Sequence, residues 1–118
     1  MIATSIEQSK KLLELGLDPK TADMWYDVTN HIRIGQRQNT YQFSWMPCWS
    51  LEALLELIPH TSFDGIELNN YNDGKTIWTA IFHWKTDSTP IRIADTPLGA
   101  VYEVVVWLIE NNYIKTEK

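Results

Sequence analysis

The sequence predicts an α+β protein, with an antiparallel sheet of three to five strands packed against two or three helices. Three observations support this class. The chain has 118 residues, which is about the size of one domain, so we expect a single α+β domain over residues 1–118. Hydrophobic patterns follow the order helix, strands, helix, strands, helix. Apolar residues make up 44% and charged residues 21%, as in ordinary globular proteins, which argues against a disordered chain.

Local sequence signals predict a helix near the N-terminus. Thr4 followed by Glu7 predicts a capping box at the start of a helix over about 5–15, because each side chain can satisfy a free backbone N–H group. Gly16 is suited to the left-handed conformation that ends many helices. Asp18-Pro19 then predicts a one-turn helix, with the aspartate as its cap.

Two further helices are predicted from their caps and apolar stripes. Ser50 predicts the start of the second helix, and Pro59 its end. Thr96 predicts the cap of a last helix over 97–111, although the three valines 104–106 favour a strand by propensity. The last segment is apolar on most of its circumference, so we expect it to be largely buried against the sheet.

Alternating apolar and polar residues predict the strands. The predicted strands are 24–26, 32–34, 41–45, 66–71, 76–84 and a short edge strand at 90–94. We expect 32–34 and 41–45 to form a hairpin across the polar segment 35–40. We also expect 66–71 to pair with 76–84 across a turn. Large apolar residues on both faces of 76–84 predict a central position in the sheet.

The charge distribution limits the possible partners. Ten basic and fifteen acidic residues give a net charge of −5, which argues against a generic nucleic-acid binder. The segment between Asp27 and Glu52 nevertheless contains no acid, and it holds His31, Arg33 and Arg37. Any anion-binding surface is therefore expected in this segment.

Several classes of protein are excluded by what the sequence lacks. There is no apolar stretch long enough to span a membrane and no signal peptide is visible, so we expect a cytoplasmic protein that does not bind membranes. The single cysteine, Cys48, excludes an internal disulfide and a cysteine-based zinc site. Phosphate-loop, dinucleotide, zinc-protease and serine-hydrolase motifs are absent, so no cofactor, metal site or catalytic residue is predicted. We expect Cys48 to be a buried structural thiol.

The candidate binding residues combine aromatic rings with arginines in the acid-free segment. They are Arg33, Arg37, Tyr41, Phe43, Trp45 and Trp49. Such side chains can anchor a protein partner or stack on bases and hold phosphates. They can equally cover the sheet, and the sequence leaves open whether the aromatic segment 41–49 is core or surface.

Two stretches carry a resemblance to known proteins. They are PCWSLEALLELIP at 47–59 and DTPLGAVYEVVVWLIENNYI at 95–114. Together with LLELGLDPKTADMWY at 12–26, they resemble small uncharacterised proteins of bacterial prophages and integrated mobile elements. The resemblance implies an accessory, phage-related protein and carries no known activity.

The sequence thus favours a non-enzymatic module that binds an unknown protein partner or associates with itself. The first alternative is a nucleic-acid accessory factor that uses the 31–49 segment. The second is a small enzyme whose site is not visible in the sequence. It would need His31, His60 or His83 to converge with Cys48 or with two carboxylates.

Overall fold

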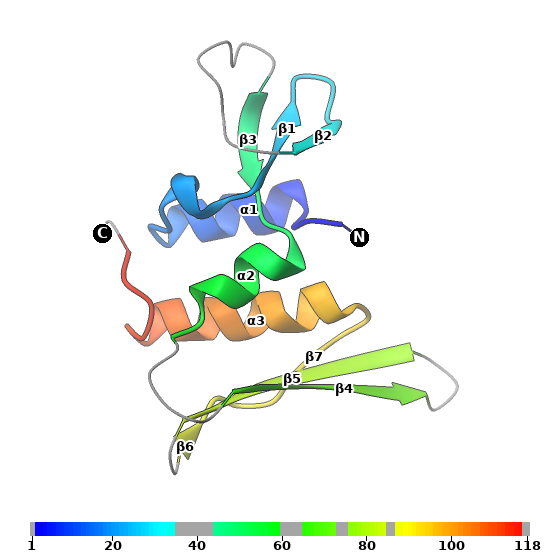
Figure 1. Ribbon diagram of the computed structural model, residues 1–118, viewed down its shortest axis with the longest axis vertical. Helices are drawn as coiled ribbons and strands as arrows, with labels where there is room; N and C mark the ends of the chain where they lie inside the picture. The colour runs from blue at the N-terminus through cyan, green and yellow to red at the C-terminus, as the bar shows by residue number, and fades with distance from the viewer. Residues whose placement is uncertain (1, 35–43, 60–64, 73–75, 85–86, 117–118) are drawn as a thin grey trace.

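The computed structural model describes residues 2–34, 44–59, 65–72, 76–84 and 87–116 (Figure 1). Its elements, in chain order, are helix α1 (Ile6–Glu14), the 3-10 helix η1 (Pro19–Thr21), β1 (Met24–Asp27), β2 (Ile32–Ile34), β3 (Ser44–Cys48), α2 (Leu51–Leu57), β4 (Ile66–Asn72), β5 (Thr76–Trp84), β6 (Asp87–Ser88), β7 (Arg92–Ala94) and α3 (Pro97–Glu110). All strand pairs are antiparallel, and the predicted α+β class is confirmed.

The described strands form two sheets, whereas the sequence predicted one. The first has the order β2-β1-β3, and in the second β5 pairs with β4, β6 and β7. The central position predicted for 76–84 is therefore confirmed. The hairpin predicted between 32–34 and 41–45 is wrong, because β2 and β3 lie on opposite edges of β1. Residues 41–43 lie outside the described part of the chain.

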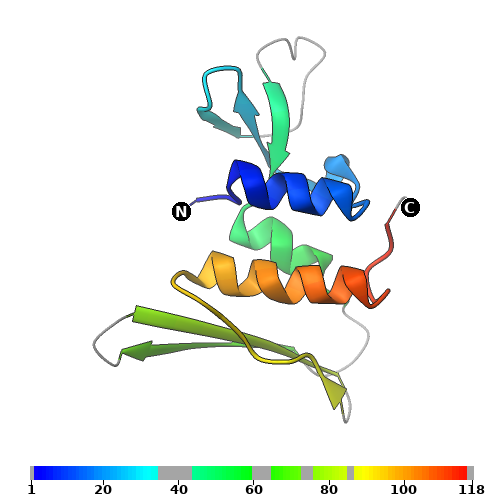
Figure 2. The ribbon, with the colours of Figure 1, turned by 180° about the vertical axis from the view of Figure 1, so that it is seen from behind.

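The helices lie between the two sheets. Figures 1 and 2 show the first sheet extending from the side of α1 and the second sheet lying against α3. The valine-rich α3 is the centre of the core: Val101, Val104, Val105 and Leu108 are fully buried. Each such side chain contributes roughly 1.5–3 kcal/mol through burial, which outweighs the weak helix propensity of valine. Ala80 and Phe82 of β5 belong to the same cluster.

Most helix ends follow the predicted local signals. Gly16 has φ 96°, a left-handed conformation that suits glycine. The carboxylate of Asp18 accepts from the Lys20 N–H at 2.9 Å. Ser50 and Thr96 cap α2 and α3 through their hydroxyl oxygens.

The cap of α1 lies one residue later than predicted. Ser5 and Gln8 form the capping box, and Thr4 is not the cap. The Thr4 hydroxyl instead accepts from the Trp49 N–H at 3.0 Å and lies 2.8 Å from the Ser9 hydroxyl. In addition, the Thr4 N–H donates to the Trp49 carbonyl at 2.8 Å. These bonds join the start of the chain to the β3–α2 connection, a contact that local sequence does not encode.

Candidate functional site

The turn between β1 and β2 is built around the Asp27 carboxylate, whose side chain is only 5% exposed. Its Oδ1 accepts from the Thr29 hydroxyl at 2.6 Å, the Thr29 N–H at 2.8 Å and the His31 N–H at 3.0 Å. Its Oδ2 accepts from Arg33 Nε at 3.0 Å. These hydrogen bonds, led by that of the Thr29 hydroxyl, hold the pKa of Asp27 well below its usual range. The carboxylate is therefore charged at neutral pH and paired with Arg33.

Only part of the predicted binding surface lies within the described residues. Arg37, Tyr41 and Phe43 are outside them, and so is the side chain of Trp45, whose backbone belongs to β3. Arg33 lies on the edge strand β2, and 70% of its side chain is exposed. Because Asp27 accepts from its Nε, the charge that Arg33 offers to a phosphate is partly neutralised.

Trp49 is buried, contrary to its place among the predicted binding residues. Its exposed fraction is 0%, and its Nε1 donates to the Thr21 hydroxyl at 2.9 Å. The backbone of Trp49 is also bonded to Thr4. Its ring therefore belongs to the core and is not available to a partner.

The described chemistry-bearing groups do not converge on a catalytic arrangement. Cys48 is fully buried, and burial, followed by the nearby Asp23 carboxylate, raises the pKa of its thiol to about 12. A thiol in this state is a poor nucleophile at neutral pH. His31 lies in the β1–β2 turn of the first sheet and His83 on β5 of the second, and His60 is outside the described residues. Within the described part of the chain, no three His, Cys, Asp or Glu side chains gather as metal ligands.

A hydroxyl and an imidazole do meet in the β1–β2 turn. Thr29 Oγ1 lies 2.8 Å from His31 Nδ1. The same hydroxyl donates to Asp27, so its proton points away from the imidazole and His31 Nδ1–H is the donor to Thr29. This arrangement orients the histidine but does not activate the threonine as a nucleophile.

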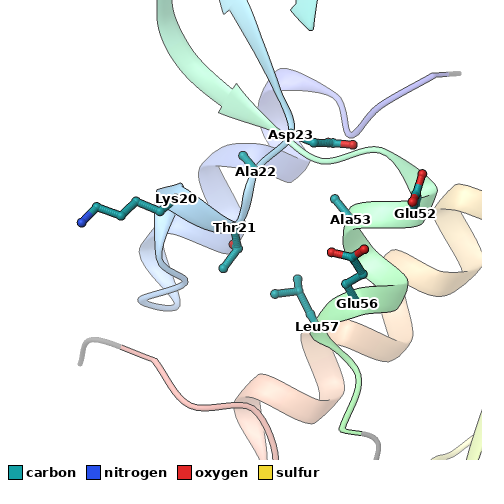
Figure 3. Close-up of a pocket in the computed structure, with 8 residues that line it drawn as sticks. All are labelled: Lys20, Thr21, Ala22, Asp23, Glu52, Ala53, Glu56 and Leu57. Atoms are coloured by element: carbon teal, nitrogen blue, oxygen red, sulfur yellow. The ribbon is translucent and has the colours of Figure 1, made fainter. Parts of the chain in front are cut away.

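A cavity of about 490 Å³ lies between η1 and α2 (Figure 3). Its lining residues are Lys20, Thr21, Ala22, Asp23, Glu52, Ala53, Glu56 and Leu57. Several of its polar groups already have partners. The Asp23 carboxylate accepts from the Ser50 N–H at 3.0 Å and from the Ser50 hydroxyl. The Thr21 hydroxyl donates to the Asp18 carbonyl at 2.6 Å.

The remaining polar groups of this cavity are carboxylates and one amine. Glu52 and Glu56 come from successive turns of α2, and the Lys20 amine extends away from the cavity in Figure 3. Both glutamates are exposed, as is usual for the polar face of an amphipathic helix, so their presence does not by itself indicate a catalytic site.

The outer face of the second sheet carries an unusual set of apolar residues. Ala80 and Phe82 point into the core, so Ile77, Thr79 and Ile81 of β5 point to the other face. Ile93 of β7 lies opposite Thr79 and is 65% exposed, and Ile91 is 60% exposed. In Figures 1 and 2 the three helices lie on the opposite side of this sheet. We call Ile77, Ile81, Ile91 and Ile93 the isoleucine face.

Such a face differs from the usual solvated side of an antiparallel sheet, which is polar. The sequence predicted apolar residues on both sides of β5 but not the exposure of one side. The alternation from Ile91 to Ile93 was the signal that could have indicated it.

Among the described residues, no helix is both long enough and apolar enough to cross a membrane. Comparisons of the chain with models of protein families, with curated proteins and with solved structures gave no match.

Proposed function

We propose that this protein is a non-enzymatic binding module that associates with a second copy of itself through the isoleucine face. The observation that carries the proposal is the exposure of Ile91 and Ile93 beside Ile77 and Ile81, on a sheet face without a helix. Contiguous exposed apolar patches with polar rims mark interaction sites. A self-complementary patch suits the two-fold symmetry of most homodimers.

The charges near the isoleucine face are compatible with a second copy. Glu67 lies opposite Ile81 in the β4–β5 register. Its Oε1 is 3.0 Å from His83 Nε2 on the neighbouring strand. When this imidazole is protonated it offsets the carboxylate charge within one chain, which reduces repulsion between two copies of this face.

The size of the face limits the expected affinity. The nine residues of β5 extend about 30 Å, and adjacent strands lie about 5 Å apart. Because β4 has seven residues and β7 only three, the three-stranded face offers roughly 300 Å² per copy, less than half of the 800 Å² in a standard interface. We therefore expect weak, concentration-dependent association.

Sedimentation velocity across a range of protein concentrations tests this proposal. The wild-type chain is expected to form dimers at high concentration, and Ile93→Asp is expected to be monomeric because the interface would bury an unpaired charge. Ile34→Asp is the matched control: Ile34 is 85% exposed on β2 of the other sheet, so this variant should associate like the wild type. A wild-type monomer at every concentration, or dimerisation of Ile93→Asp at wild-type strength, would contradict the proposal.

The other expectations from the sequence stay predictions. An accessory role in a prophage or mobile element rests on the resemblance alone, and we propose it together with a cytoplasmic location and a single domain. Nucleic-acid binding receives less support, because Asp27 pairs with Arg33 and the net charge is −5. The small-enzyme alternative has no group of described residues in its favour.

A further inference from the structure

A second cavity, of about 470 Å³, lies between α1 and α3, away from the isoleucine face. We call it the α1–α3 groove. Its lining includes Glu7 and Lys11 of α1, and Tyr102, Glu103, Val106 and Glu110 of α3. Three carboxylates and one ammonium group give it a local charge of about −2, which favours a cationic ligand.

The phenol of Tyr102 distinguishes this groove from an ordinary solvated helix face. Only 7% of the residue is exposed, yet Tyr102 lines the groove. None of the described residues makes a hydrogen bond to its hydroxyl. Burial, together with the carboxylates of Glu103 and Glu110, raises the pKa of Tyr102 to about 12. The neutral hydroxyl thus keeps an oxygen that can accept a hydrogen bond from a cationic N–H group.

The carboxylates of the groove also lack cationic partners among the described residues. The ion pairs of the described residues involve Asp27 and Glu67, which lie elsewhere. None joins a described cation to Glu7, Glu103 or Glu110. By contrast, Asp23 in the η1–α2 cavity is bonded to Ser50. The α1–α3 groove therefore combines carboxylates that have no cationic partner among the described residues with the hydroxyl of a nearly buried tyrosine that has no described hydrogen bond.

The spacing of these groups indicates the size of the ligand. Glu103 and Glu110 are seven residues apart on α3, which corresponds to about 10 Å along the helix. This backbone spacing suits two cationic groups, one beside each glutamate, better than a single guanidinium or ammonium group. A peptide that carries two or more cationic side chains supplies them, and guanidinium groups form the stronger paired hydrogen bonds with carboxylates.

We propose that the α1–α3 groove binds an arginine-bearing peptide segment of a partner protein. Guanidinium groups pair with Glu103 and Glu110, and one N–H donates to the Tyr102 hydroxyl. Val106 supplies apolar contact for the arginine methylene groups. This site is independent of the isoleucine face, so a self-associating chain would present one groove per copy.

Isothermal titration calorimetry with a tetra-arginine peptide, at about 50 mM salt, tests the proposal. The wild-type protein is expected to show saturable binding that weakens steeply with added salt. The double variant Glu103→Gln/Glu110→Gln is expected to bind about tenfold more weakly or worse. Glu52→Gln/Glu56→Gln is the matched control, because it removes the same two charges from α2. It should bind within about twofold of the wild type.

Tyr102→Phe tests the hydroxyl separately from the charge. It should weaken peptide binding several-fold while leaving the thermal stability unchanged or higher, because the hydroxyl has no described partner to lose. Thermal melts of every variant verify the fold. The absence of saturable binding, equal losses in the two double variants, or wild-type affinity of Tyr102→Phe would each overturn the proposal. A monomeric chain that binds the peptide would refute only the self-association.

Discussion

Replacing Thr4 by valine tests the contact that joins the N-terminus to the β3–α2 connection. Thr4, Ser9 and Trp49 are all fully buried. The Thr4 hydroxyl accepts from the Trp49 N–H at 3.0 Å and lies 2.8 Å from the Ser9 hydroxyl. Valine has nearly the same shape but no hydroxyl, so Thr4→Val leaves both groups without this partner. The backbone bond from the Thr4 N–H to the Trp49 carbonyl is retained.

The expected destabilisation follows from the buried groups that lose a partner. An unsatisfied backbone N–H costs about 1–3 kcal/mol, and the lost hydroxyl pair adds about 1 kcal/mol. We therefore expect Thr4→Val to lower the free energy of unfolding by about 2–4 kcal/mol. For a chain of 118 residues, each kcal/mol corresponds to about 4 °C in the melting temperature. The expected decrease in Tm is thus about 8–16 °C.

Urea unfolding of a double-mutant cycle provides the assay. Ser9→Ala alone should cost less than Thr4→Val, because Thr4 still accepts from the Trp49 N–H. In the Ser9→Ala background, Thr4→Val should cost about 1 kcal/mol less than in the wild type, since the serine hydroxyl is no longer left unpaired. A Thr4→Val variant within about 0.5 kcal/mol of the wild type would refute the argument that this hydroxyl is a structural acceptor.

Two further predictions concern titratable groups. The folded-state pKa of Asp27 is depressed, so the carboxylate contributes its full stability above about pH 4 and loses it as the pH falls further. Asp27→Asn should therefore be less stable at neutral pH and lose less stability in acid, as measured by urea unfolding at a series of pH values; parallel profiles of the two proteins would count against this. For Cys48, native protein at neutral pH should resist a thiol reagent that labels the denatured chain, because the thiol is buried and its pKa is raised to about 12. Labelling at the rate of a free cysteine would show that the thiol is accessible. Because the thiol is buried, Cys48→Ala should lower the free energy of unfolding by about 1–3 kcal/mol.

The features that sequence alone determined are those with short-range causes. Asp18-Pro19, Ser50 and Thr96 predicted their caps correctly, since a cap needs only a side-chain acceptor two or three residues before a free N–H. Gly16 marked the end of the first helix for an equally local reason. The long apolar pattern of α3 identified a buried helix despite its valines.

The tertiary structure decided the features that depend on distant partners. The α1 cap moved from Thr4 to Ser5 because the Thr4 hydroxyl bonds to Trp49, 45 residues away. The order β2-β1-β3 depends on which strands meet, and alternation within one strand does not specify its neighbour.

The tertiary structure also determined which apolar side chains are exposed to solvent. Tryptophan is common at protein interfaces, but Trp49 is buried, and Thr4 and Thr21 from distant parts of the sequence form hydrogen bonds with it. Ile93 has a typical core side chain, but it is exposed because the helices occupy only the other side of its sheet. Glu7 of α1 and Tyr102 of α3 line one groove only because two helices far apart in sequence lie on its two sides. A hydrophobic side chain favours burial, but the packing of elements distant in sequence determines which side chains are buried.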